Sequence, residues 1–308
     1  MRSLPLLVLA GCAQMACAHD ISGWKKMSNN HFVVFTNESR GTADSVIERL
    51  EDVHAGLASS FFGATTPPPM MVFLFSEPEF RDLLGPVGGR FIGGPDGQGA
   101  LVIYDGWDPQ LIEVTAAHEL AHGFINVTYP RAPGWFHEGF ATYLESIIVE
   151  EKMVWFGSVT VAAGLEAGRG RLIPVADLFT EDAQQFHGEW EVRHYSTAWA
   201  LFHYVLHGEN KTLRRRFDSF GATLASLGSR PQAGAAAWKA VYPEIPLEAL
   251  DGRVRDHLST AFGRHVDSRI GFRLVRPPVP EPRLEPANMT FIDRWRAALA
   301  KLKRPDKL

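Results

Sequence analysis

The chain has 308 residues, of which 45% are hydrophobic and 21% are charged, and its formal net charge at pH 7 is −4. This is the composition of an ordinary globular protein, and it excludes the strongly basic proteins whose overall charge binds nucleic acid. The length is sufficient for one large domain or two closely packed subdomains. No internal repeat is evident along the chain.

The N-terminus has the pattern of a signal peptide, which we expect to cover residues 1–18. Its apolar stretch, Leu4–Ala10, is too short to cross a membrane. Two processing sites compete, because Leu9-Ala10-Gly11-Cys12 resembles a bacterial lipobox and Ala16-Cys17-Ala18 fits ordinary cleavage. We therefore expect export to the cell envelope, either to the periplasm or to the outer membrane through a lipid on Cys12, with secretion as the alternative. The mature domain has no cysteine for a disulfide or a metal ligand.

The next part of the chain, residues 19–149, alternates strands and helices. Strand patterns at 31–36, 71–75 and 100–104 are separated by a long helix and a glycine-rich loop, and two further helices follow. The loop, 85–99, lacks the Gly-Lys-Ser/Thr ending of a phosphate-binding loop, so we expect a flexible flap near a cleft. This order predicts an α+β fold with a mixed sheet flanked by helices.

Residues 150–265 are expected to form a mainly helical subdomain. Residues 172–179 read as a short connection. Helices are predicted around 195–206, 211–220, 233–241 and 246–261.

The first of the two helices before residue 149 carries the segment His118-Glu119-Leu120-Ala121-His122. Asp108-Pro109 provides an N-cap and a first-turn proline ahead of it. Positions i and i+4 share one helix face, so His118 and His122 can bind the same ion while Glu119 addresses a water on it. This pattern is a zinc-hydrolase signature, which predicts Zn²⁺ as the cofactor.

A catalytic zinc ion takes three protein ligands, so one more is required. A metzincin would need Gly at position 125 and His at 128, where this chain has Ile125 and Thr128, and that class is excluded. Glu138 lies in the second helix, which opens at Pro133-Gly134 and whose small Gly139 and Ala141 are expected to let it approach the first helix closely. His137 is the rival ligand, although it points about 100° away from Glu138 around the helix.

The two motifs together, His-Glu-x-x-His and Pro-x-Trp-x-x-Glu-Gly-x-Ala, resemble the gluzincin metallopeptidases of the thermolysin-like clan. The chain is most similar to a poorly characterised bacterial peptidase-like group, over segments that include Asn30–Thr36, Met71–Phe75 and Tyr195–Tyr204. The resemblance implies a gluzincin-like fold, in which an N-terminal mixed sheet and the motif helix precede a mainly helical C-terminal subdomain. It implies His118, His122 and Glu138 as zinc ligands and Glu119 as the general base.

The resemblance also implies Tyr195 as the hydrogen-bond donor to the transition state. From the pattern alone, the Tyr195 phenol points inward near the start of a helix, where it can serve an oxyanion or be an ordinary core tyrosine. His194 is an alternative donor. The strand at 100–104 corresponds to the edge strand that pairs with extended peptides in gluzincins.

The C-terminal segment, 275–308, is expected to be a proline-rich linker followed by a basic amphipathic helix from Phe291 to Leu302. Such a helix can lie on a membrane or cover an apolar groove of the enzyme.

These patterns predict an exported zinc metallopeptidase, an endopeptidase acting on peptides or proteins. Two alternatives remain open: a zinc-stabilised envelope protein that binds peptides without cutting them, and a hydrolase of a non-peptide amide. An intact Glu119 favours catalysis, since a binding site has no use for a general base. Membrane association is expected through the Cys12 lipid or the C-terminal helix, and no pattern indicates the oligomeric state.

Overall fold

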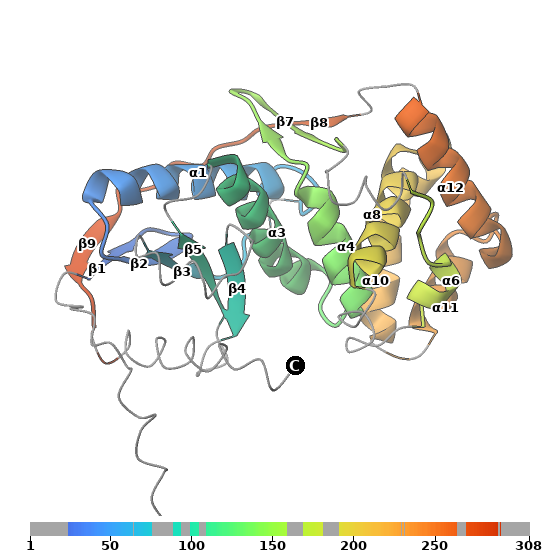
Figure 1. The fold of residues 1–308 in the computed structure, drawn as a ribbon, viewed down its shortest axis with the longest axis horizontal. Coiled ribbons are helices and arrows are strands. Elements are labelled where there is room, and N and C mark those ends of the chain that lie inside the picture. Colours follow the sequence, from blue (N-terminus) through green and yellow to red (C-terminus); the bar gives the residue numbers. More distant parts are fainter. Residues whose placement is uncertain are drawn as a thin grey trace, which may run out of the picture.

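The computed structural model describes residues 24–63, 65–75, 89–93, 99–104, 109–158, 169–180, 191–228, 230, 232–263, 269–288 and 290. The predicted signal peptide, with Cys12, and the predicted C-terminal helix after residue 290 lie outside these residues. The chain folds into a mixed sheet flanked by helices, followed by a mainly helical part, and helices α3 and α4 lie between the two (Figure 1). This architecture agrees with the predicted α+β class.

The main sheet has the strand order β4-β5-β3-β2-β1-β9. Its central strands β2, β3 and β5 are parallel, whereas β1, β4 and β9 pair antiparallel with their neighbours. The sheet is therefore mixed, as predicted. Its strands are β1 (Lys25–Ser28), β2 (Phe32–Thr36), β3 (Met70–Phe75), β4 (Gly89–Gly93), β5 (Gly99–Tyr104) and β9 (Arg283–Pro286).

Two sheet predictions are wrong. The strand at 100–104 was expected at the sheet edge, but β5 lies between β3 and β4, and β4 forms the edge. The expected flap, 85–99, contains the strand β4 itself, because residues 89–93 pair in register with β5. The described part of the predicted linker also contains a strand, since β9 adds to β1.

Helix α1 (Arg40–Ala58) runs along the sheet in Figure 1 and packs against α3. Ser39 caps its N-terminus by accepting a hydrogen bond from the Thr42 amide at 3.1 Å. The face toward the core contributes Val46, Leu50 and Val53, all of which are buried. Burial of this apolar stripe holds α1 in place, as expected for an amphipathic helix.

Helix α3 (Pro109–Thr128) and helix α4 (Gly134–Leu144) carry the two sequence motifs. We expected Gly139 to face α3, but it faces α8 (Glu191–His207) instead. A Cβ atom at Gly139 would lie 2.5 Å from the Cβ of Ala198. The glycine thus permits close contact between α4 and α8, and this contact brings the start of α8 next to α3 and α4.

The second part contains a small sheet that was not predicted from the sequence. Its strands, in the order β6-β7-β8, are β6 (Ile148–Val149), β7 (Met153–Phe156) and β8 (Ile270–Arg273). β6 precedes and β8 follows the predicted helical subdomain, 150–265, whereas β7 lies within it. The remaining described helices are α6 (Val175–Leu178), α9 (Lys211–Arg215), α10 (Phe217–Leu227), α11 (Ala233–Val241) and α12 (Leu247–Gly263).

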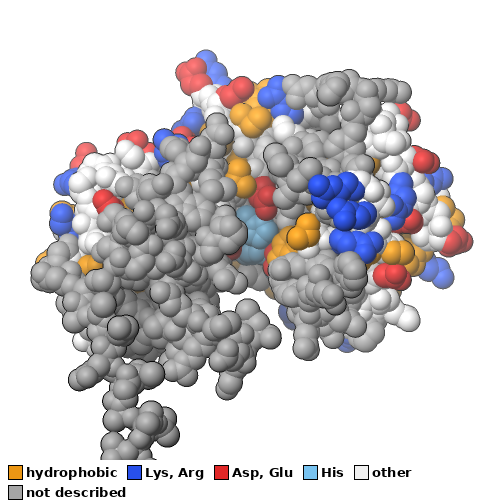
Figure 2. Space-filling model, viewed as in Figure 1, with side chains coloured by type: hydrophobic (Ala, Val, Ile, Leu, Met, Phe, Trp, Pro, Cys, Tyr) orange, Lys and Arg blue, Asp and Glu red, His pale blue; other side chains and the backbone are white. Residues whose placement is uncertain are grey.

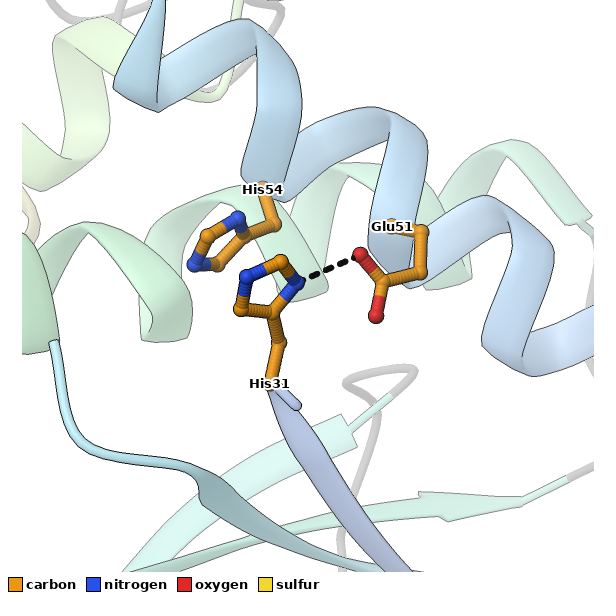
Figure 3. Close-up of side chains that lie close together, drawn as sticks. All are labelled: His31, Glu51 and His54. Carbon is orange, nitrogen blue, oxygen red and sulfur yellow. Dashed lines mark hydrogen bonds and ion pairs between the residues drawn. The ribbon is translucent and has the colours of Figure 1, made fainter. Parts of the chain in front are cut away.

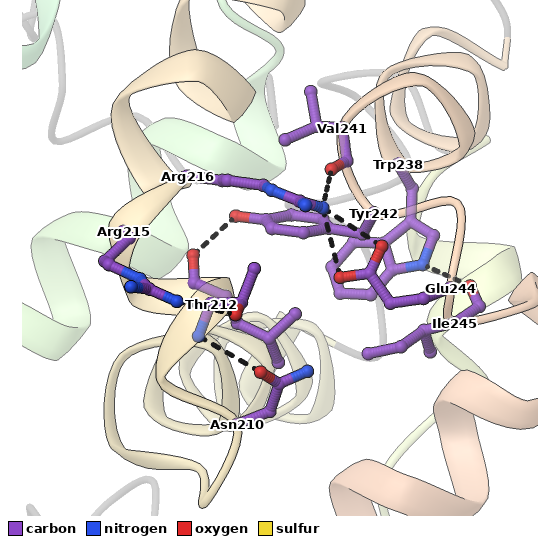
Figure 4. A network of polar contacts seen from close by, with 10 residues as sticks. Asn210, Thr212, Arg215, Arg216, Trp238, Val241, Tyr242, Glu244 and Ile245 are labelled. Atoms are coloured by element: carbon purple, nitrogen blue, oxygen red, sulfur yellow. Dashed lines mark hydrogen bonds and ion pairs between the residues drawn. The ribbon is translucent and has the colours of Figure 1, made fainter.

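The predicted helices correspond to α8, α11 and α12, but α6 lies in the predicted connection 172–179, and the helix predicted at 211–220 is divided into α9 and α10. Arg216 separates α9 from α10, and its guanidinium donates to the Val241 carbonyl at 3.0 Å and pairs with Glu244 (Figure 4). Tyr242 donates to the Leu213 carbonyl in the same network. These contacts tie the break to the end of α11. In the described part of the chain, no helix has both the length and the apolar character to cross a membrane.

Candidate metal centre

The first two predicted ligands lie on α3, which is buried along one side. Ala117, Leu120 and Ala121 pack into the core, whereas the side chains of His118 and His122 keep 15% and 17% of their surface exposed. The two rings lie one helical turn apart with centroids 4.9 Å from each other and planes at 80°. Burial of this side of the helix therefore fixes two imidazoles at the surface of the core.

Glu138 reaches the same point from α4. Its Oε2 atom lies 3.3 Å from His118 Nε2 and 3.7 Å from His122 Nε2. One ligand atom from each of these residues lies within 4.8 Å of the others, so the three side chains form a group that could hold a metal ion. The structure thus brings together the three predicted ligands.

Glu145, directly after α4, was not identified from the sequence. Its Oε1 atom lies 2.7 Å from His118 Nδ1. A hydrogen bond from Nδ1 to a carboxylate fixes the ring orientation and leaves Nε2 to face the metal position, as in many metal sites. A signal was present, since Glu138 and Glu145 are seven residues apart and therefore share a helix face.

The charges of the site favour a cation. Burial lowers the pKa of His118, but hydrogen bonds with Glu138 and Glu145 and the nearby charge of Glu119 raise it overall to about 10. Burial likewise raises the pKa of Glu138, but the contacts with His118, His122 and Tyr195 lower it to about 2. Without a metal, the site holds a proton between His118 and its two carboxylates. A metal ion would displace that proton, so binding should weaken at low pH.

Tyr195 lies in the first turns of α8, which begins at Glu191. Its ring is stacked with that of His118 at a centroid distance of 6.4 Å, and its hydroxyl makes a hydrogen bond with Glu138. Trp199 and Phe202, further along α8, are buried, so the helix face that Tyr195 begins is turned toward the core, as predicted. The phenol therefore meets the predicted ligands, unlike an ordinary core tyrosine.

The rival residues lie close by. His137 stacks on His122 with centroids 6.2 Å apart, and burial, partly offset by the charge of Glu138, lowers its pKa. Among the described residues it belongs to neither group of possible metal ligands, and the same is true of the buried His194. Glu119 is half-buried beside His118 on α3.

Figure 2 shows histidine and acidic side chains at the bottom of a depression between the sheet and the helical part. The side chains of His118, His122 and Glu138 are partly exposed, which leaves the site accessible to solvent. Two imidazoles, a carboxylate and a supporting carboxylate form a donor set for a divalent metal ion, with an acid and a phenol beside it. The chain matches no protein-family model and no curated protein.

Proposed function

We propose that the protein is an exported zinc metallopeptidase of the gluzincin type, in which His118, His122 and Glu138 bind zinc and Glu119 is the general base. The convergence of His118, His122 and Glu138 on one point carries this proposal. The order of the elements agrees with it, because the mixed sheet precedes α3 and the third ligand comes from the following helix.

The donor set favours zinc over harder cations. Two imidazoles and one carboxylate are ligands that zinc accepts, whereas calcium and magnesium prefer oxygen alone. Three protein ligands are also the number found in catalytic zinc sites, which keep a further position for water or substrate. Glu145 would raise the basicity of His118 and hold its ring in place.

Glu119 and Tyr195 have separate roles in the proposed hydrolysis of an amide. When bound, zinc polarises the substrate carbonyl and lowers the pKa of a water molecule. Glu119 accepts the proton of the attacking water and later gives it to the leaving amine. The Tyr195 hydroxyl, which bonds Glu138 in the free protein, would turn to the developing oxyanion.

The edge strand β4 is suited to hold an extended peptide. It ends the six-stranded sheet and contacts α3, the helix that carries both histidines. A peptide that adds to this edge would make main-chain hydrogen bonds, which impose little side-chain specificity. The proposal therefore assigns to β4 the role that the sequence assigned to β5.

A digest of a proteome-derived peptide library tests this function. Purified zinc-loaded protein should produce new peptide ends, detected by mass spectrometry, and removal of zinc with a chelator should abolish them. Peptides that are retained by the protein but not cut would favour the binding-protein alternative. Cleavage of non-peptide amides alone would favour a hydrolase of non-peptide amides.

A further inference from the structure

A second cluster of possible metal ligands lies on the side of α1 that faces the sheet. His31 precedes β2, and Glu51 and His54 come from α1 (Figure 3). One ligand atom from each residue lies within 4.8 Å of the others, and Glu51 Oε2 lies 2.7 Å from His31 Nδ1. A glutamate and a histidine three positions apart share a helix face, a spacing that metal sites in helical proteins use.

His54 has an unsatisfied nitrogen. Its side chain is 4% exposed, and its Nε2 atom has no hydrogen-bond partner. A buried polar atom without a partner is costly, and an imidazole nitrogen of this kind is a common metal ligand.

Glu51 is held by a turn that is itself hydrogen-bonded. The Asn29 amide donates to Glu51 Oε1 at 2.8 Å, and the Asn29 side-chain oxygen accepts from the backbone amides of His31 and Phe32. The second carboxylate oxygen remains directed at His31, as Figure 3 shows. This arrangement resembles the outer shell that orients the ligands of metal sites.

A groove of about 540 Å³ leads to the cluster and is lined in part by Asn29 and Glu51. Five carboxylates and one guanidinium line it, from Asp44, Glu48, Glu51, Asp52, Glu281 and Arg40. Arg40 pairs with Asp44, and Arg276 pairs with Asp52, so part of this charge is compensated. The remaining negative charge would draw cations toward Glu51.

The imidazole rings of His31 and His54 must change their relative orientation before both can bind one metal ion. The imidazoles of His31 and His54 are stacked with centroids 3.9 Å apart and planes at 18°. A metal ion lies in the plane of each imidazole that binds it, so one of the two rings must turn for both to share an ion. The hydrogen bond between His31 and Glu51 would then be replaced by two bonds to the metal.

We propose that His31, Glu51 and His54 form a second site, which binds a divalent transition metal ion such as Zn²⁺ and has a structural role. Two imidazoles and a carboxylate suit zinc, cobalt or nickel better than calcium or magnesium. A bound ion would link the start of β2 to α1. It would also support α3, because His54 packs against Phe124 with ring centroids 5.0 Å apart.

Metal content of the full chain tests this site separately from the first. After equilibrium dialysis against Zn²⁺, mass spectrometry of the metal should find about two ions per chain in the wild type. Glu51→Gln and His54→Phe should each bind about one, and so should His122→Ala, which disrupts only the first site. Glu48→Gln, in the same groove but outside the cluster, should retain both ions.

Thermal unfolding distinguishes a variant that has lost only the metal site from a variant that does not fold. In the His122→Ala background, Zn²⁺ should still raise the melting temperature, and adding Glu51→Gln should abolish that rise. The metal-free melting temperatures of the variants show whether they fold. A single ion per wild-type chain that His122→Ala removes, or two ions in a folded Glu51→Gln, would overturn the second site. Unchanged metal content in His122→Ala would count against the first site instead.

Discussion

His118 donates a hydrogen bond from Nδ1 to Glu145, at a distance of 2.7 Å, while its Nε2 faces Glu138. The imidazole is therefore held on both sides by carboxylates, one of which is a proposed ligand and the other a support. Glu145 lies just after α4, so the helix that supplies the third ligand also orients the first.

This relationship predicts that Glu145→Ala weakens metal binding without abolishing it. Loss of a supporting carboxylate usually lowers metal affinity by about 10- to 100-fold. Glu138→Ala, which removes a proposed ligand, should lose most of the metal, and His137→Ala should retain it. Competition with a zinc chelator measures all three. The exposed Glu151→Ala is the control, and an affinity of Glu145→Ala equal to that of this control would show that Glu145 has no supporting role.

Tyr195→Phe should reduce turnover while leaving the zinc content unchanged. The hydroxyl is proposed to stabilise the oxyanion, and removal of one such donor typically costs about 10²- to 10³-fold in kcat. The rate of cleavage of a library-derived peptide and the metal content of the same sample are the two measurements. If zinc is lost along with the activity, the hydrogen bond to Glu138 is what matters, and Tyr195 supports a ligand instead of the transition state.

The site was largely readable from the sequence because its residues lie at helical spacings. His118 and His122 share a face of a helix whose apolar side is buried, and Glu138 lies on the next helix. Glu145 was missed because a single glutamate after a helix has many ordinary roles on a surface. Glu51 and His54 were missed because two such residues on a helix are not distinctive alone, and the third residue of the cluster, His31, comes from another segment.

The fold was less readable where strands are short or pair over long distances. β4 lies among glycines, and only its pairing with β5 identifies it as a strand. β8 and β9 pair with β7 and β1, respectively, which are far away in the sequence. No local pattern encodes such a pairing, because the stabilising contacts are made by the partner strand.

Close contact between α4 and α8 predicts that Gly139→Ala is destabilising. The new Cβ would lie 2.5 Å from that of Ala198, and overpacking of this kind costs about 1–3 kcal/mol. Gly252→Ala in α12 is the matched control, since no heavy atom lies within 4 Å of its Cβ position. That change should be neutral or stabilising, by up to about 1 kcal/mol. Equal free energies of unfolding for the two variants in urea would refute the close contact.

His203 predicts that the fold loses stability in acid. The residue is fully buried between His207 and His257, with its Nε2 donating to the Gly157 carbonyl at 3.2 Å. Burial, with the charges of His207 and His257, lowers its pKa from 6.5 to about 3. Between these two pH values the unfolded chain binds more protons than the folded chain, so stability decreases as pH falls through this window.

His203→Gln should therefore flatten the pH dependence while lowering stability at pH 7. Below the pKa of the unfolded state, the free energy of unfolding of the variant should change less steeply with pH than that of the wild type, by on the order of 1 kcal/mol per pH unit. Urea unfolding of the wild type and the variant at several pH values between 7 and 4 measures it. Parallel stability curves would mean that His203 does not contribute to acid sensitivity.

The most direct test of the proposed peptidase is Glu119→Gln, because the proposal gives this residue a proton to move and no bond to the metal. Wild type and variant are loaded with zinc, checked for metal content and compared on the same peptide substrate. The variant should retain zinc and fold and lose turnover by at least the roughly 10²- to 10⁴-fold typical of an acid–base group. Cleavage at the wild-type rate by zinc-loaded Glu119→Gln would contradict the proposed mechanism, and zinc-loaded wild type that cuts no peptide would contradict the function.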